Sequence, residues 1–180
     1  MSSSPAEPVT ADPDAPRDDA WFTALFHEHA TSVHRYLLRR AHTDDVEDLT
    51  AETFAVAWRR RDDIPHGFEL QWLFRTAGFL VSNHHRKKRA TPVEELPERD
   101  TTIDPMHDVI DDEGLKQAFR QLSDRDREVL LLSAWEGLGA SDNAGVLNIS
   151  SNAASVALSR ARSRLLHALD GDVSDTSSPR

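Results

Sequence analysis

Two clusters of charged side chains in this sequence have a spacing suited to binding another macromolecule. Asp48 and Glu52 are four residues apart, so on a helix they project side by side, about 40° apart around its axis. They form either a solvated acidic face or a docking surface for a basic or polar helix of a partner. Residues 84–89, with the sequence HHRKKR, carry four consecutive Lys/Arg after two histidines. This charge is denser than a helix C-terminus requires, and it predicts contact with phosphate groups.

No constellation of residues favours catalysis or metal binding. The sequence has no cysteine, which excludes disulfides, thiol nucleophiles and thiolate metal sites. It has no glycine-rich phosphate loop and no HExxH motif, and its nine histidines are dispersed. The pairs His27/His29 and His84/His85 do not place both rings on one helix face for a metal. We therefore expect a protein that is not an enzyme and that needs no metal and no cofactor.

The net charge of −10 is unevenly distributed along the chain. Residues 21–90 and residues 115–169 each carry a charge of +2, so the whole deficit lies in the three segments outside them. Those segments are acidic and poor in apolar residues, which is typical of tails and linkers. The most acidic of them, residues 91–114, carries a charge of −8. Two weakly basic modules are therefore predicted to be joined by an acidic tether.

The predicted fold class is all-α, with two small helical domains and a flexible linker. The segments are a disordered tail at residues 1–19, a helical domain at 20–90, the acidic linker at 91–112, a second helical domain at 113–170 and a disordered tail at 171–180. No apolar run approaches the ~20 residues needed to span a bilayer. The first residues are acidic and Pro-rich, unlike a signal peptide. We expect a cytoplasmic protein without membrane insertion.

Helical periodicity predicts three helices in the first domain, at residues 20–42, 44–61 and 70–89. The first two have complementary apolar stripes and a short turn between them, so antiparallel packing is expected. Asp44 is placed to cap the second helix. The aromatic residues near the third helix are expected to lie mostly in the core, with one or two left to stack on an unpaired base.

The second domain contains a candidate helix-turn-helix at residues 140–164. Ser123 is placed to cap the helix that precedes it. Asn148 stands where a turn glycine is usual, and Asn tolerates the left-handed conformation. Ser150 or Ser151 would then cap the second helix of the motif. A plain αα-hairpin remains an alternative on this pattern alone.

Taken together, the motifs resemble those of the extracytoplasmic-function sigma factors, a group of the bacterial primary-sigma family. Residues 22–89 look like sigma region two, through the D-x-x-D-L-x-x-E-T-F-x-x-A-W run at residues 45–58, Trp72-Leu73 and the basic cluster. Residues 115–169 are similar to region four, through LSDRDREVLLLSAWEGL at residues 122–138 and the LSRAR run that ends at Arg162. The resemblance implies a transcription initiation factor that binds core RNA polymerase and directs it to promoter DNA.

The resemblance also implies a role for individual residues. Those expected to meet the clamp helices of the largest polymerase subunit are Asp45, Asp48, Leu49, Glu52 and Arg59. Those expected to recognise and open the −10 element are Phe68, Trp72, Arg75, Asn83, Arg86, Lys87, Lys88 and Arg89. At the −35 element, the bases would be read by Ser151, Asn152 and Ser155, and the phosphates would be bound by Arg160, Arg162 and Arg164. Further implied partners are the polymerase flap and an anti-sigma factor.

The sequence departs from the family pattern at several positions. Gly78-Phe79 replaces a typically polar pair, and Asn83 stands where Asp is frequent. Asn143 occupies a normally aliphatic position, so the first helix of the motif should pack less well. Ser155 and Ala157 replace common Lys and Arg, which predicts weak binding of residues 110–170 alone to duplex DNA.

A second hypothesis is a helix-turn-helix regulator that works without polymerase and uses the first domain as a sensor or dimerisation module. A sensor has no need of an acidic helix face beside a basic, aromatic helix. Binding to core polymerase discriminates between the two hypotheses.

Overall fold

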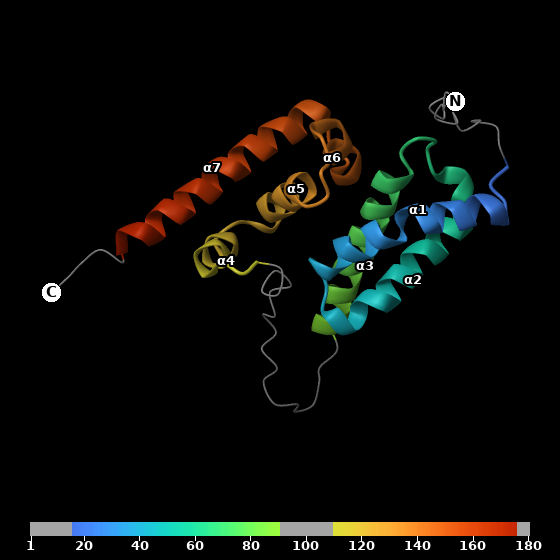
Figure 1. Cartoon of the computed structure of the whole chain (residues 1–180), viewed down its shortest axis with the longest axis horizontal. Coiled ribbons are helices and arrows are strands. Elements are labelled where there is room, and N and C mark those ends of the chain that lie inside the picture. Colours follow the sequence, from blue (N-terminus) through green and yellow to red (C-terminus); the bar gives the residue numbers. More distant parts are fainter. Residues whose placement is uncertain (1–15, 91–109, 176–180) are drawn as a thin grey trace, which may run out of the picture.

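The computed structural model describes residues 16–90 and 110–175, and these form helices and connecting turns without a strand (Figure 1). The all-α prediction is confirmed. The elements are α1 (Asp19–Leu38), α2 (Thr43–Arg59), the 3-10 turn η1 (Arg61–Asp63), α3 (Glu69–Ala90), α4 (Glu113–Arg120), α5 (Asp124–Ala134), α6 (Ala140–Leu147) and α7 (Ser151–Asp175).

Helices α1, α2 and α3 pack together as an N-terminal unit. The apolar stripe predicted for α2 is buried, as Val46, Leu49, Thr53, Phe54 and Ala57. Its neighbour α3 buries Leu73, Phe74 and Ala77, each no more than 1% exposed. The Tyr36 ring of α1 stacks on Phe74 with centroids 4.7 Å apart. The unit is thus held by apolar faces whose period is that of a helix.

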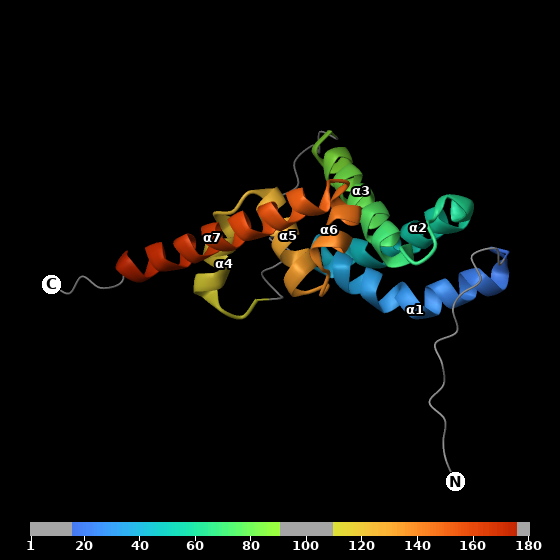
Figure 2. The same cartoon turned by 90° about the horizontal axis from the view of Figure 1, so that it is seen from above.

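Helices α4 to α7 form a C-terminal unit in which the long α7 contacts α4, α5 and α6 (Figure 2). The Ser123 side chain caps α5 by accepting a hydrogen bond from the Asp126 amide at 3.2 Å. Asn148 ends α6 in the left-handed conformation at φ 54°, as the sequence predicts. Ser150, one of the two predicted caps, accepts from the Ala153 amide at the start of α7. The α6–turn–α7 segment is therefore a helix-turn-helix.

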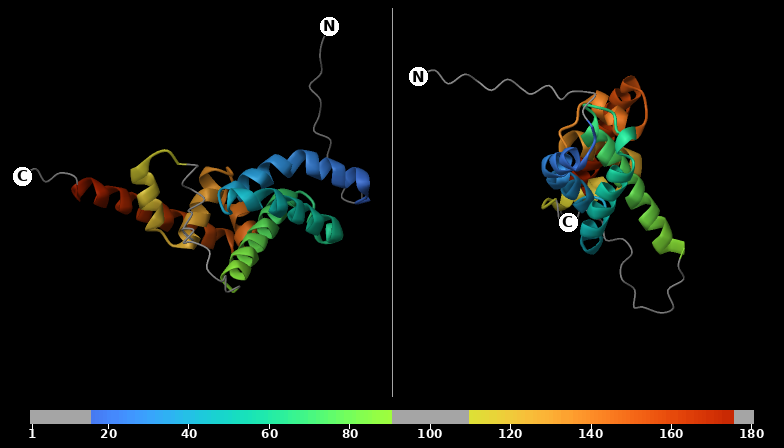
Figure 3. Two further views of the ribbon diagram at one scale, coloured as in Figure 1. Left: turned by 90° about the horizontal axis from the view of Figure 1, so that it is seen from below. Right: turned by 90° about the vertical axis from the view of Figure 1, so that its right-hand side faces the viewer.

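The two units also contact each other. Leu132 of α5 and Val146 of α6 belong to the same buried cluster as the core of the N-terminal unit. Helix α6 lies against α3, which Figure 1 and both views of Figure 3 show. Residues 91–109 of the predicted linker lie outside the described residues, while Ile110 is buried in the C-terminal unit. The sequence did not predict this direct contact between the units.

Several predicted boundaries move in the structure. Helix α2 begins at Thr43 and is capped by His42 Nδ1, which accepts from the Asp44 amide at 3.3 Å, so Asp44 is not the cap. Helix α7 continues to Asp175, so residues 171–175 are helical rather than a tail. Residues 1–15 of the other predicted tail lie outside the described residues, and α1 starts at Asp19. Within the described ranges, no helix has the length and apolar character of a membrane span.

Candidate polymerase and nucleic-acid interfaces

The acidic face, Asp48 and Glu52, is exposed on α2. The opposite side of the helix is buried, because Leu49 and Thr53 face the core and fix the rotation of α2. Arg59, two turns further on, is also exposed, and its Nε donates to the Ala55 carbonyl at 3.3 Å. The exposed surface of α2 therefore carries two carboxylates and, two turns further along the helix, one guanidinium group. This distribution suits a partner whose surface is mainly positive.

Two of the residues expected on this surface lie elsewhere. Leu49 is only 3% exposed, so its side chain belongs to the core, and its expected contact with polymerase stays a prediction. Asp45 is half-buried, and its Oδ2 lies 3.1 Å from His84 Nε2 of α3. Asp45 therefore connects α2 to α3. The outer surface of α2 is left to Asp48, Glu52 and Arg59.

Helix α3 presents a face formed by Arg75, Phe79 and Arg86, which we call the α3 face. These residues lie within about 40° of one another around the helix axis. All three are exposed, and Phe79 is the most exposed large apolar side chain in the described part of the chain, at 63%. They line one wall of a groove of about 810 Å³ between the units. An aromatic ring between two guanidinium groups can stack on a base while the cations bind phosphates.

The other predicted −10 residues are distributed around the start and end of α3. Phe68 precedes the helix and is 52% exposed, whereas Trp72 is half-buried against the core. Asn83 Oδ1 accepts from Arg86 Nη2 at 2.5 Å, and Lys87 is exposed. The side chains of Lys88 and Arg89 lie outside the described residues. Phe74, which the sequence left as a stacking candidate, is in the core.

The sequence did not place Phe79 among the −10 residues, although it left one or two aromatic side chains near the third helix free to stack on a base. The signal was present in the departure from the family pattern, since an apolar ring replaces a polar residue at that position. Helical spacing alone did not resolve whether Phe74 or Phe79 is buried, because both lie close to the apolar stripe of α3. The structure places Phe74 inside and Phe79 outside.

On α7, the six predicted −35 residues divide between two sides of the helix. Three of them, Asn152, Arg160 and Arg164, line a hollow of about 480 Å³ together with Val156 and with Arg125 of α5. Ser155 is exposed, and its Oγ donates to the carbonyl of Ser151 at 3.0 Å. The hollow therefore presents an amide, an apolar side chain and three cations along this side of α7.

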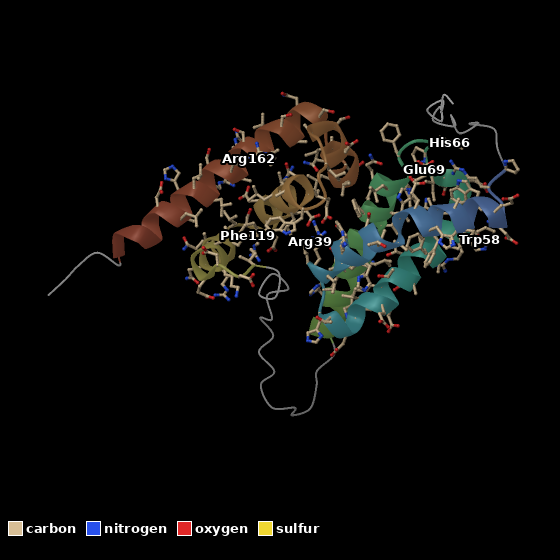
Figure 4. All side chains as sticks on the ribbon, viewed as in Figure 1. Arg39, Trp58, His66, Glu69, Phe119 and Arg162 are labelled. Atoms are coloured by element: carbon tan, nitrogen blue, oxygen red, sulfur yellow. The ribbon has the colours of Figure 1, made fainter. Side chains whose placement is uncertain are left out.

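Arg164 and Arg162 are engaged within the C-terminal unit. Arg164 Nη1 lies 2.5 Å from Asp126 Oδ2, which also accepts from Ser123 Oγ at 2.7 Å. The hydrogen bond from Ser123, and then the Arg164 guanidinium, outweigh burial and lower the pKa of Asp126. Arg162 Nη2 donates to Ser133 Oγ at 3.4 Å, and Figure 4 shows its position along α7. Arg160 has no hydrogen bond or ion pair within the described ranges, so it is the predicted −35 cation most available to DNA.

Profiles of two protein families match the chain. The profile described as "Sigma-70 region 2" matches residues 25–91, and "Sigma-70, region 4" matches residues 112–165. The two matches correspond to the N-terminal and C-terminal units, in the order that the sequence motifs predict. The described residues contain no group of three or more His, Asp or Glu side chains that could hold a metal ion.

Individual proteins are similar as well. The ECF RNA polymerase sigma factor BldN of Streptomyces coelicolor is 28% identical over 141 residues, which are 70% of this chain and 52% of BldN, so the chain spans about half the length of this relative. The sigma factor RpoE of Bartonella quintana, solved with the anti-sigma factor NepR, has a TM-score of 0.60 at 22% identity over 83% of this chain and 96% of its own. CnrH, solved with the cytosolic domain of CnrY, has a TM-score of 0.59 at 23% identity over 86% and 91%. At these identities, the two structures establish similarity of fold only.

Proposed function

Because this chain belongs to the extracytoplasmic-function group of the sigma-70 family, we propose that it binds core RNA polymerase in the cytoplasm and directs transcription from specific promoters. The observation that carries the proposal is a pairing of surfaces in the N-terminal unit. An exposed carboxylate pair lies on α2, and an exposed Arg–Phe–Arg face lies on the adjacent α3. The first suits a protein partner, and the second suits separated DNA strands.

In this proposal, Asp48, Glu52 and Arg59 bind the clamp helices of the largest polymerase subunit. Reversing the charge of the acidic face should weaken binding strongly, since like charges juxtaposed across an interface cost several kcal/mol. Asp48→Arg/Glu52→Arg should reduce capture of core polymerase at least tenfold. The matched control is Glu28→Arg/Glu113→Arg, which makes the same change of charge at two exposed acids outside α2. Equal capture by both double variants would contradict this assignment.

We propose that the α3 face, with Phe68 before it, binds the −10 element as it opens. Phe68 and Phe79 offer rings to unpaired bases, while Arg75 and Arg86 bind the backbone. This is single-strand binding by stacking, which tolerates several bases at a position. The test of the whole function is transcription in vitro with purified core polymerase on genomic fragments, with start sites mapped. Failure to select start sites would refute it.

At the −35 element, we propose that α7 reads A·T pairs. Asn152 can bond adenine N6 and N7, and Val156 can contact a thymine methyl group in the major groove. These side chains are one helical turn apart and share the hollow beside Arg160. Replacing thymine by deoxyuridine in the −35 duplex removes the methyl group alone. This change should weaken promoter binding by the wild-type holoenzyme and have a smaller effect with Val156→Ser.

An anti-sigma factor is the remaining proposed partner. The support is that RpoE and CnrH, which share this fold, were solved in complex with the anti-sigma factor NepR and with the cytosolic domain of CnrY. Expression of this chain with candidate partners and co-purification would test it.

The alternative function is a regulator that works without polymerase. It requires that the chain bind promoter DNA as tightly without core polymerase as with it.

A further inference from the structure

The residues just before α1 are held in a defined position. Asp18 caps α1, because its Oδ1 accepts hydrogen bonds from the Ala20 and Trp21 amides, each at 3.0 Å. Arg17, directly before this cap, is half-buried, and its guanidinium carbon lies 5.2 Å from the centre of the Trp21 ring. A guanidinium and an indole attract each other in this arrangement. The cap and the ring therefore fix where the Arg17 side chain points.

The Arg17 guanidinium binds the turn that connects α2 to α3. Its Nη1 donates to the carbonyl of Arg61, the first residue of η1, and its Nη2 donates to the carbonyl of Ile64, the residue after η1. Carbonyl groups near the C-terminal end of a helix carry partial negative charge, which favours a cation there. The planar guanidinium presents its N–H donors in a fixed fork, so one side chain binds two carbonyls of the same turn.

A second arginine–tryptophan pair lies beside the first. Arg61 Nη1 donates to the Trp58 carbonyl at 3.1 Å, and the Arg61 guanidinium carbon lies 4.6 Å from the centre of the Trp58 ring. The Trp58 ring in turn meets Phe22 of α1 edge to face, with centroids 5.2 Å apart. Figure 4 shows Trp58 near the end of α2 and His66 in the turn that leads to α3. The turn is thus connected to α1 on both sides.

An exposed loop follows directly after this turn. Ile64 is 1% exposed, so its side chain anchors the chain in the core, whereas all four residues from Pro65 to Phe68 are exposed. The Phe68 amide donates to the Pro65 carbonyl at 3.2 Å, which closes the loop on itself. The direction in which the loop leaves the N-terminal unit is therefore set at Ile64, where Arg17 binds.

The hydrogen bonds of Arg17 differ in range from the others in this segment. They span 44 and 47 positions of sequence. Among the described residues, the other hydrogen bonds of residues 61–68 join positions no more than four apart. Local bonds of this kind shape a turn but do not fix its orientation relative to another helix. The match to sigma-70 region 2 begins at residue 25, so Arg17 lies outside it.

We infer that Arg17 is a positioning residue for −10 recognition, because it braces the turn after α2 and thereby orients the exposed loop at residues 65–68. This inference rests on the proposed function, in which Phe68 of that loop binds the −10 element as it opens. A loop that is already oriented loses less conformational freedom when it captures a base. The brace therefore favours capture of the correct base.

The brace is tested first in the free full-length chain. Because the chain has no cysteine, His66→Cys places a single nitroxide label in the exposed loop. Adding Arg17→Ala should shorten the rotational correlation time of the label roughly twofold, since loop motion becomes less restricted. Arg17→Lys keeps the charge but not the fork, so it should give an intermediate value, and it replaces the alanine variant if that one does not fold. Arg35→Ala, at an exposed arginine of α1, is the matched control. Equal mobility in the Arg17→Ala and Arg35→Ala chains would overturn the brace.

The effect on recognition is measured by transcription with core polymerase. The templates are a promoter mapped from genomic fragments and the same promoter with one −10 base pair changed. Arg17→Ala should lower the ratio of the two rates roughly fivefold, the scale expected for ordering one side chain at an interface, and leave capture of core polymerase unchanged. A variant that is merely less stable would not change this ratio, because both templates report on the same folded fraction. An unchanged ratio would overturn the positioning role.

A direct contact between Arg17 and the DNA backbone predicts a different result. Loss of one phosphate contact lowers the slope of log affinity against log salt by about 0.9, whereas loss of the brace leaves that slope unchanged. A lower slope for promoter binding by the Arg17→Ala holoenzyme, with an unchanged ratio of rates, would overturn the inference. Inactivity of the wild-type chain with core polymerase would instead refute the proposed function, and with it the role in recognition, while the label would still report whether Arg17 braces the turn.

Discussion

Asn143 of α6 offers a test of the packing argument. Most substitutions in a protein core lower the free energy of unfolding, whereas an apolar substitution at this position is expected to raise it. The residue is 0% exposed, and neither Oδ1 nor Nδ2 has a hydrogen-bond partner among the described residues. A buried polar group without a partner costs about 1–3 kcal/mol. Asn143→Leu removes both orphaned atoms and adds apolar surface, while its slightly larger volume costs up to about 1 kcal/mol. We expect the variant to be more stable by about 2 kcal/mol.

The assay is urea unfolding of the full-length chain followed by circular dichroism. With a slope near 2 kcal/mol/M, the midpoint should rise by about 1 M with the slope unchanged. If the chain melts as one unit, Tm should rise by about 4–8 °C. Asn152→Leu, the same change at an exposed position of α7, should alter stability by less than about 0.5 kcal/mol.

A lower midpoint for Asn143→Leu would refute the reasoning, because it would mean that the amide makes hydrogen bonds in solution. Asn143→Ala helps to interpret the result. It also removes the orphaned atoms but leaves a void, so it should gain less stability than Leu.

Three further predictions follow from the geometry. Because the pKa of Asp126 is lowered in the folded state, its contribution to stability is fully present above the unfolded value of 3.8 and is lost as pH falls through the folded pKa. The difference in urea midpoint between wild type and Asp126→Asn should therefore be larger at pH 7 than at pH 3. Gly78→Ala should destabilise the chain by about 1–2 kcal/mol in urea melts, because the new β-carbon clashes with the Tyr36 hydroxyl. In a Tyr36→Phe background the same substitution should be neutral or stabilising. The control Gly145→Ala, at a position where a β-carbon meets no such clash, should not destabilise the chain. Phe79→Ala should weaken binding of single-stranded −10 DNA by the holoenzyme by about 1–3 kcal/mol and leave duplex binding unchanged, and an equal loss on both would argue against stacking.

The fold class and most helices could be predicted from the sequence because their determinants are local. The stripe of α2, the Ser123 cap and the left-handed Asn148 each depend on residues within a few positions of one another. The family motifs are local in the same sense, since each lies within one helix or one turn. Helix ends were less certain, as His42 shows, because several neighbouring side chains can cap the same turn.

The choice between neighbouring residues on a helix was decided by the tertiary structure. Periodicity cannot tell which of Phe74 and Phe79 is buried, since a rotation of one helix by a few tens of degrees changes the answer. Packing against the other helices sets that rotation, and it buries Phe74 while exposing Phe79. Only the tertiary structure shows that Asp126 of α5 pairs with Arg164, which the sequence predicts as a DNA contact.

The docking of the two units is the feature least accessible from the sequence. Arg40 and Glu128 are 88 positions apart, and nothing in the local pattern of either predicts that they meet. Each reads as an ordinary surface charge on its own helix. Only the folded chain brings them together, because burial is a property of the surfaces that enclose a side chain and not of its neighbours in sequence. The sequence by itself therefore determined the helices and the family, and the tertiary structure decided which charges are buried and whether the two units lie apart or together.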